Sequence, residues 1–375
     1  MFAPIPNTIT FCGESLARMK TQGEVPCEVL SSLREQADAL LDAPFLSVVD
    51  RRLHAPTGNL HEYASMGPYW WPNPDTADGL PYVRRDGEFN PESVEEVTYR
   101  RMAERAHLLA LAAYHFEDSR YGACAAKTLA VWHTEKDTFM TPHAKYAQCI
   151  PGICDGRGIG LIDFSFSYMI FDAVAILEAI GQIEPSLVLA LKEWYVTFID
   201  YMLTSENGLA EEIHHNNHGA WYDVQILAAA RFTERPWLAK RVVKLAYDRR
   251  LKAHIRPDGS QPFELERTRA INYSMYNLLA LTQIANMAAD LGEQTYWGID
   301  EQDGVCLLRQ AFDFIAFLVT HPDQNPYTEL DPQDVPALFS QLAMRMDAKF
   351  PGNGYAELAR PHLTDSAAWR AHPCL

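Results

Sequence analysis

Histidine and asparagine side chains are concentrated in one stretch of the chain, residues 214–222, which reads His-His-Asn-Asn-His-Gly-Ala-Trp-Tyr. Imidazole exchanges protons near neutral pH, and a side-chain amide can donate hydrogen bonds to a carboxylate. His214 and His218 are four residues apart, which would suit two zinc ligands on one helical face. The stretch has no HExxH pattern and no acidic residue, so we expect no metal there. The alternative is the start of a helix, with Asn216 or Asn217 as its N-cap and the histidines in solvent.

A second polar stretch, residues 258–273, begins with a turn and leads into a predicted helix. Arg269 and Tyr273 are four residues apart, so on a helix they share one face. A guanidinium beside a phenol favours the phenolate and would lower the pKa of the tyrosine from its usual value of about 10. The alternative is that Arg267 and Arg269 pair with Glu264 and Glu266 at the surface, with the tyrosine as an ordinary core residue.

The third candidate is a long loop, residues 55–91, rich in proline, glycine, asparagine and aspartate. Loops of this length in compact domains are usually lids or binding loops. Aromatic side chains beside arginines suit a polymer of anionic sugars, because sugar rings stack on aromatic faces and carboxylates accept paired hydrogen bonds from arginine. The residues in question are Tyr69, Trp70, Trp71, Arg84 and Arg85. The alternative is a loop that buries its own aromatic side chains.

Most of the remaining chain, which must position these three stretches, is predicted to be α-helical. Apolar residues recur at helical spacing in residues 28–43, 102–113, 120–134, 164–180, 186–204, 219–233, 236–254, 269–291, 304–320 and 333–348. Prolines 185 and 236 mark helix starts, and glycines 181 and 292 mark helix ends. Residues 205–219 interrupt the pattern, and no stretch alternates as a strand would. We predict an all-α fold, a single domain over residues 1–375 in which antiparallel helices form an α/α toroid around a cleft or tunnel, with the 55–91 loop as a lid.

Composition narrows the classes of partner. The chain has 49 acidic and 32 basic residues, for a formal net charge of −17. This balance argues against nucleic acid or an anionic membrane as partner, since both attract basic surfaces. No stretch reaches the roughly 18 apolar residues of a membrane span. The seven cysteines are scattered without a CxxC pair, which predicts free thiols, with a Cys149–Cys154 bridge as the alternative.

Taken together, the three stretches resemble the alginate lyase superfamily of helical-toroid polysaccharide lyases, family 38 more closely than family 5. The resemblance covers about residues 47–318. The motifs that carry it are His61-Glu62-Tyr63, Tyr69-Trp70-Trp71-Pro72-Asn73-Pro74, Gly79-Leu80-Pro81-Tyr82, Arg85-Asp86-Gly87, Asn216-Asn217-His218-Gly219, Trp221-Tyr222-Asp223, Asp258-Gly259-Ser260-Gln261-Pro262, Arg267-Thr268-Arg269 and Tyr273.

The resemblance implies β-elimination in a β-1,4-linked polyuronate such as alginate or glucuronan. Hydrogen-bond donors must neutralise the uronate carboxylate before the C5 proton can leave. The matching donors are Asn217 and Arg267, with Arg269 as the alternative arginine. A base and an acid complete the reaction, and their matching positions are His218 and Tyr273. The resemblance implies no metal or organic cofactor.

The same resemblance implies residues that bind the polymer and a place where the enzyme acts. The expected substrate contacts are Tyr69, Trp70, Trp71, Arg84, Arg85, Asn216, Arg269 and Trp221, while His214 and His215 are expected to be bystanders. Such lyases usually act in the periplasm or outside the cell, which we expect here too. The sequence as given starts without a visible signal peptide, so a cytoplasmic location stays open.

Two other functions remain open from the residues alone. A glycoside hydrolase on a helical toroid would use two carboxylates, with Asp163, Asp172, Glu211, Glu212 and Asp223 as candidates. A non-catalytic protein that binds acidic glycans could use the same groove. The presence of all four residues expected for elimination favours the lyase over the binding protein.

Overall fold

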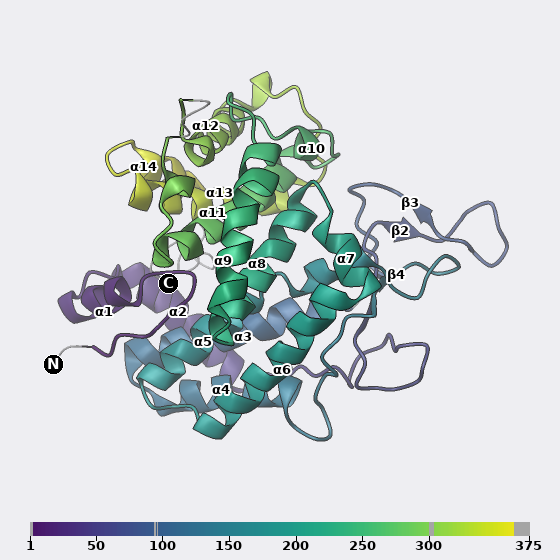
Figure 1. Cartoon of the computed structure of the whole chain (residues 1–375), viewed down its shortest axis with the longest axis horizontal. Helices are drawn as coiled ribbons and strands as arrows, with labels where there is room; N and C mark the ends of the chain where they lie inside the picture. The colour runs from purple at the N-terminus through teal and green to yellow at the C-terminus, as the bar shows by residue number, and fades with distance from the viewer. Residues whose placement is uncertain (1–2, 94, 96, 300–303, 364–375) are drawn as a thin grey trace.

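The computed structural model describes residues 3–93, 95, 97–299 and 304–363, and most of these residues are helical. The α-helices, drawn in Figure 1, are α1 (Gly13–Gln22), α2 (Cys27–Leu41), α3 (Thr98–Phe116), α4 (Ser119–His133), α5 (Ser167–Ala179), α6 (Pro185–Thr204), α7 (Glu206–Glu212), α8 (Asn217–Phe232), α9 (Pro236–Ala246), α10 (Pro262–Leu265), α11 (Ala270–Asp290), α12 (Leu307–Thr320), α13 (Val335–Lys349) and α14 (Tyr355–Ala359). This confirms the predicted all-α class.

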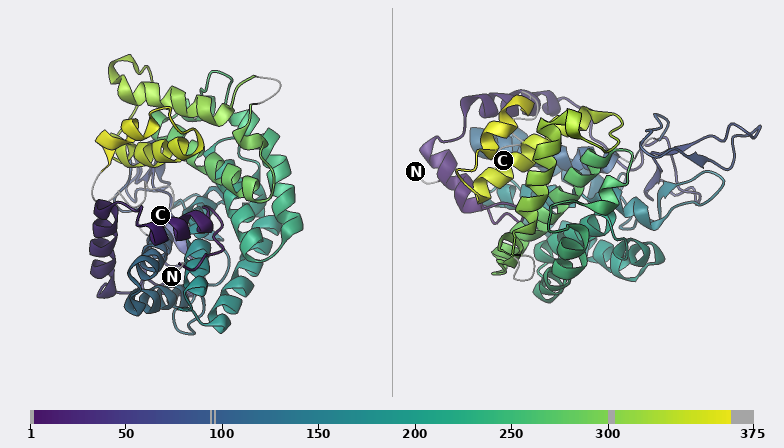
Figure 2. Two further views of the ribbon diagram at one scale, coloured as in Figure 1. Left: turned by 90° about the vertical axis from the view of Figure 1, so that its left-hand side faces the viewer. Right: turned by 90° about the horizontal axis from the view of Figure 1, so that it is seen from above.

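The long helices form two layers. The inner helices follow one another in space, α3 against α5, α5 against α8, α8 against α11 and α11 against α13. Each inner helix is backed by an outer one, namely α4, α6, α9, α12 or α14. The C-terminal helices lie at the same end of the molecule as α1 and α2 (Figure 2). This is the predicted toroid of paired helices, and its inner layer surrounds the site described below.

Burial explains why these segments are helices. Helix α3 is rich in alanine and leucine, strong helix formers that also let neighbouring helices approach closely. Helices α8 and α11 are buried over nearly all their length. Pro185 and Pro236 start α6 and α9, as predicted, and Gly181 and Gly292 follow helix ends with positive φ angles of 65° and 88°.

Four helices were not predicted from the sequence: α1, α7, α10 and α14. Helix α7 lies inside the 205–219 interruption, and the Ser205 hydroxyl caps it by accepting from the Gly208 backbone N–H at 3.0 Å. A Cβ atom at position 208 would meet the Met202 carbonyl oxygen at 1.8 Å, so only glycine fits there. The tight turn from α6 into α7 therefore depends on this residue.

The described residues also contain four short strands that the sequence pattern did not predict. Strand β1 (Ala64–Met66) pairs in parallel with β4 (Tyr146–Cys149). Strands β2 (Trp70–Trp71) and β3 (Val83–Arg84) form an antiparallel hairpin with Trp70 opposite Arg84. The hairpin is part of the 55–91 loop and projects from the helical body on the side away from α1 (Figure 1). We call this projecting segment, residues 67–91, the arm.

Two expectations from composition have different outcomes. The segment Gly158–Ala179 is long and apolar enough to cross a membrane, contrary to the prediction, but 83% of its apolar window is buried inside the protein. It contributes to the core as a 3-10 turn followed by α5. Cys149 and Cys154 are unbridged, as predicted for free thiols. Cys374 lies outside the described residues.

Candidate active site

One large cavity, about 1740 Å³ in volume, brings the three polar stretches together. Its wall is formed by the arm, by the start of α8, by the start of α11 and by the inner faces of several helices. Of the residues singled out in the sequence, it is lined by Tyr69, Trp70, Arg84, His214, His215, Asn216, Asn217, His218, Arg267, Arg269 and Tyr273. Segments up to about 200 residues apart in the chain thus share one chemical environment.

His218 lies in the first turn of α8 and is held from two sides. The Asn216 side chain accepts a hydrogen bond from the His218 backbone N–H at 3.2 Å, which confirms it as the N-cap. The His218 ring nitrogen Nδ1 lies 2.7 Å from Oε1 of Glu211, a carboxylate on α7 that is fully buried. A carboxylate at Nδ1 keeps the ring proton there and leaves the lone pair of Nε2 free to accept a proton.

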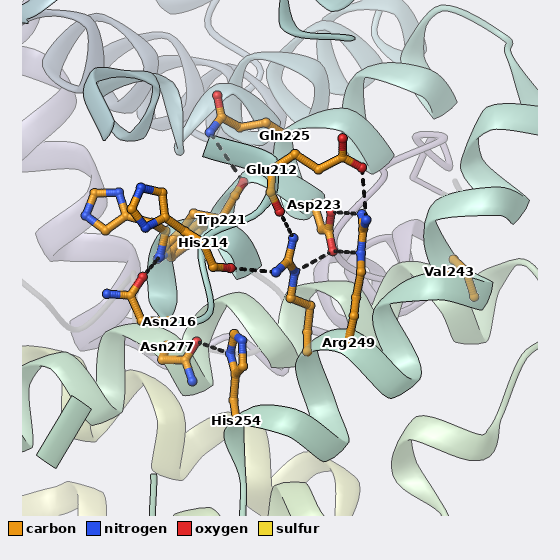
Figure 3. A network of polar contacts seen from close by, with 12 residues as sticks. Glu212, His214, Asn216, Trp221, Asp223, Gln225, Val243, Arg249, His254 and Asn277 are labelled. Carbon is orange, nitrogen blue, oxygen red and sulfur yellow. Dashed lines mark hydrogen bonds and ion pairs between the residues drawn. The ribbon is translucent and has the colours of Figure 1, made fainter. Parts of the chain in front are cut away.

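A buried network fixes the turn that precedes α8 (Figure 3). The Arg250 guanidinium pairs with Asp223 at 2.9 Å and donates to the backbone carbonyls of Glu212 at 2.6 Å and His214 at 2.7 Å. Arg249 joins Asp223 to the Glu212 carboxylate, which lies 2.9 Å from its guanidinium. Because breaking one partner out of a buried ion pair is costly, this network holds the start of α8 in place.

Asn217 is held by a buried carboxylate that the sequence analysis placed at the surface. Glu264, on α10, accepts from the Asn217 backbone N–H at 2.6 Å and from its Nδ2 at 2.7 Å. Glu264 is only 2% exposed, so the predicted surface pairing with Arg267 and Arg269 is wrong for this residue. Burial raises the pKa of Glu264 to about 7, against the lowering effect of the Asn217 hydrogen bonds.

The raised pKa of Glu264 predicts a pH-dependent stability. Its folded pKa of about 7 lies above the ordinary 4.5, so the folded state binds the proton more tightly and the free energy of unfolding falls as pH rises from about 4.5 to 7. Glu264→Gln should remove this loss, which is on the order of 3 kcal/mol. Urea unfolding of both proteins at pH 5 and pH 8 measures it. Parallel pH profiles would contradict the assignment, since all other titrating groups are shared.

Tyr273 contacts an arginine, but not the one expected. The guanidinium of Arg267 lies 3.9 Å from the centre of the Tyr273 ring, and the Tyr273 hydroxyl is 2.6 Å from the hydroxyl of Tyr69. Burial raises the pKa of Tyr273 well above its usual value, and the Tyr69 neighbour adds to this, while Arg267 opposes it. The expected lowering of this pKa is therefore wrong, and Tyr273 is a neutral phenol at rest.

The arm supplies the partner of Arg267. The Asp86 carboxylate accepts hydrogen bonds from Nε of Arg267 at 3.2 Å and from its Nη2 at 2.9 Å. The Thr268 hydroxyl donates to the same carboxylate at 3.0 Å. Burial raises the pKa of Asp86, but the charges and hydrogen bonds of Arg267 and Arg84 outweigh it and lower the value to about 2. Asp86 is thus ionised, and it fixes Arg267 over Tyr273.

Other predicted contacts are placed differently. The Arg269 guanidinium donates to the backbone carbonyls of Leu330 at 3.1 Å and Asp331 at 2.9 Å, which holds the segment before α13. Trp71 and Arg85 stack on each other, 5.0 Å apart, on the arm, and neither lines the cavity.

The prediction that Trp221 contacts the substrate is wrong. Its ring is fully buried and packs against Tyr168 and Tyr276, with ring centres 6.4 Å and 4.8 Å away. Unlike Asn217, Trp221 is not among the residues that line the cavity, so its role is in packing behind the cavity wall.

The candidate carboxylates of a hydrolase have structural partners. Asp163 lines the cavity but accepts hydrogen bonds from Tyr63, Ser65 and Gln148, and burial raises its pKa to about 6. Asp172 accepts from the N-terminal segment at Thr10. The other three candidates are engaged as well, Glu211 by His218 and both Glu212 and Asp223 by Arg249. No group of three or more His, Cys, Asp or Glu side chains in the described ranges is arranged to hold a metal ion.

The sequence analysis missed four residues near the reacting groups. Glu211 was considered only as a hydrolase carboxylate, and Glu264 only as a surface partner. Gln148 and Arg157, which also line the cavity, bond to each other at 3.0 Å, and Arg157 lies 5.8 Å from the ring of Trp70. The sequence could not predict these roles, because each depends on a contact with a residue from another part of the chain.

Comparison with known proteins gives a consistent result. A family model described as Alginate lyase matches residues 47–324. A crystal structure of an alginate lyase from Bacteroides ovatus is similar with 32% sequence identity and a TM-score of 0.91, and the match covers 98% of this chain and 99% of that one. Alginate lyase A1-III from Sphingomonas species A1 is similar in fold, with 16% identity, a TM-score of 0.58, and coverage of 88% and 91%. A variant of that enzyme complexed with a tetrasaccharide gives 16% identity and a TM-score of 0.59, with coverage of 91% and 93%. No curated protein matches the chain.

Proposed function

This chain belongs to the alginate lyase family and is a polysaccharide lyase, and from this we propose that it cleaves alginate by β-elimination at the cavity described above. The observation that carries the proposal is the meeting of four groups in one cavity: the imidazole of His218, the amide of Asn217, the guanidinium of Arg267 and the phenol of Tyr273. The match to the alginate lyase from Bacteroides ovatus covers nearly the whole length of that protein, which supports alginate as the polymer.

Two of these groups neutralise the uronate carboxylate. Removing the C5 proton places negative charge on that carboxylate, so donors aimed at it lower the barrier. Asn217 uses one N–H of its amide to bind Glu264, and the second N–H can donate to the substrate. Arg267 binds Asp86 through Nε and Nη2, so Nη1 can donate as well. Both donors are held by buried or ionised carboxylates before substrate arrives.

The other two groups move protons. Nε2 of His218 takes the C5 proton, the electron pair of that C–H bond forms the C4–C5 double bond, and the C4–O4 bond breaks. The departing O4 takes the hydroxyl proton of Tyr273, whose raised pKa keeps it protonated at rest. In a guluronate the C5 proton and O4 lie on opposite faces, which suits this pair. In a mannuronate they lie on one face, where the tyrosine alone would have to take and give the proton.

The test is ultraviolet absorbance over time with purified protein and separate samples of polymannuronate, polyguluronate and glucuronan. The C4–C5 double bond absorbs, whereas the product of a hydrolase does not. A rise with either alginate block supports the proposal. A folded protein that gives no rise with any of the three, while releasing reducing ends, would favour the hydrolase instead.

Glu211 is proposed as a positioning residue for His218. In Glu211→Gln the side chain keeps its size, but its amide N–H would face Nδ1 and favour the ring tautomer with the proton on Nε2. We expect kcat on polyguluronate to fall by about 10²-fold with little change in KM, as when the orienting group of another histidine base is lost. Glu206→Gln, an exposed position on the same helix, is the control. A fall in both variants, or a rise in KM alone, would contradict the role.

A further inference from the structure

The cavity continues beyond the reacting groups into the interior of the toroid. There it is lined by four side chains from four inner helices, Arg100 on α3, Tyr168 on α5, Tyr276 on α11 and Arg345 on α13. We call these residues the inner cluster. Both arginines act electrostatically on Tyr168, and Arg100 and Tyr168 act on Tyr276, which indicates that the four lie close together. Two cations and two aromatic rings are the same combination of side chains that the sequence analysis associated with anionic sugars.

Arg345 is the member of the inner cluster whose charge is least balanced. Its guanidinium donates to the Thr282 hydroxyl at 3.2 Å and to the Gln283 amide oxygen at 2.8 Å, in the amide orientation that satisfies both groups. Both acceptors are neutral. Among the described residues no carboxylate forms an ion pair with Arg345, and Asp172, which acts on it at longer range, is bound to Thr10.

An unbalanced charge in the protein interior is costly, and burial accordingly lowers the pKa of Arg345. Arg100 differs, since Glu104 lies 3.0 Å from its guanidinium. The nearby Glu104 carboxylate is engaged by Arg100, so it leaves Arg345 without an anionic partner in the described part of the chain. A carboxylate that enters the cavity would supply it through a charge-assisted hydrogen bond.

The inner cluster lies on the path of a long ligand. Thr282, the partner of Arg345, follows Tyr273 by nine residues on α11, which corresponds to roughly 14 Å along the helix. The cavity volume of about 1740 Å³ exceeds the roughly 300–1,000 Å³ of a small-molecule pocket. The space between Tyr273 and Arg345 therefore accommodates sugar units of one continuous chain.

We propose that the inner cluster is a binding subsite for a second uronate of the same polymer, several units away from the bond that is cleaved, with Arg345 binding its carboxylate. This inference rests on the proposed alginate lyase function. The subsite makes cleavage depend on chain length, because only substrates that reach Arg345 gain the extra contact.

The experiment compares Arg345→Met with the unaltered protein. Methionine is unbranched and apolar and removes a partly buried charge, a change that folded proteins often tolerate. Alginate oligosaccharides from the shortest one cleaved up to the octamer are assayed by ultraviolet absorbance. We expect kcat/KM for the octamer to fall about tenfold and that for the shortest substrate to change less than twofold. Arg241→Met, an exposed arginine on α9, controls for the lost charge.

Equal changes at every length, or no change at the octamer, would overturn the subsite. Binding of the octamer to each protein in a Tyr273→Phe background gives a second readout that does not need turnover, and there the dissociation constant should rise about tenfold. If Arg345 instead takes a small free anion, Arg345→Met will alter the thermal stabilisation by sodium glucuronate and leave the length dependence intact. Failure of the proposed function is distinguishable, since then the unaltered protein cleaves no alginate oligosaccharide.

Discussion

Tyr273→Phe is expected to lower kcat on alginate by about 10³-fold or more, while oligosaccharide binding stays within a few-fold. The variant removes the one hydroxyl proposed to protonate O4, and general acid catalysis of this kind contributes about 10²- to 10⁴-fold. The phenylalanine ring retains its place under the Arg267 guanidinium, which lies 3.9 Å from the ring centre. The donors to the substrate carboxylate are therefore undisturbed, and ground-state binding should persist.

The measurement combines ultraviolet turnover with calorimetric binding of an alginate oligosaccharide. Tyr69→Phe is the matched comparison, because it removes the partner hydroxyl 2.6 Å away but leaves the phenol of Tyr273 in place. We expect it to cost far less than Tyr273→Phe. Near-normal turnover in Tyr273→Phe would overturn the mechanism. Equal losses in the two variants would show that the pair acts as a unit.

His218→Ala is expected to slow the cleavage of the two uronates of alginate to different extents. Turnover of polyguluronate should fall by about 10²- to 10⁴-fold, because the base on the face opposite O4 is lost. Polymannuronate should lose much less, since its C5 proton and O4 lie on the face served by Tyr273, which would take the proton there as a phenolate stabilised by the Arg267 guanidinium. The ratio of the two rates, from ultraviolet assays on each block polymer, is the quantity to compare.

His214→Ala is the control for this variant. The two histidine rings lie 5.4 Å apart, but His214 is 3.7 Å from the Glu211 carboxylate where His218 is 2.7 Å away. We therefore expect His214→Ala to change neither rate strongly. Equal losses on both polymers in His218→Ala would contradict the division of labour between His218 and Tyr273.

The sequence predicted the long helices well, because proline, glycine and helical apolar spacing mark them locally. It missed α7 because that helix is short and lies inside a polar stretch. Only glycine fits at position 208, against the end of α6, and the apolar spacing gives no sign of this constraint. Trp221 was assigned to the wrong surface for a related reason. Helix α8 is apolar on nearly every side, so its periodicity cannot indicate which face meets the cavity.

The reacting residues were identified by resemblance, whereas their supports required the folded structure. Glu211 and Glu264 are ordinary acidic residues in the sequence, and only burial beside His218 and Asn217 gives them roles. The same holds for the pKa of Tyr273. The neighbouring arginine was expected to lower it, but the sequence gives no measure of the burial that raises it.

The contact between the arm and the start of α11 has a consequence for how such enzymes can be recombined. Asp86 binds Arg267 and Thr268, and Gly87, with a φ of +78°, lies so close to Thr268 that a Cβ there would be 2.3 Å from its hydroxyl oxygen. The arm is therefore not an interchangeable module. Grafting another lyase's loop onto this scaffold would preserve the toroid but leave the arginine unanchored, unless the aspartate–glycine pair were transplanted with it.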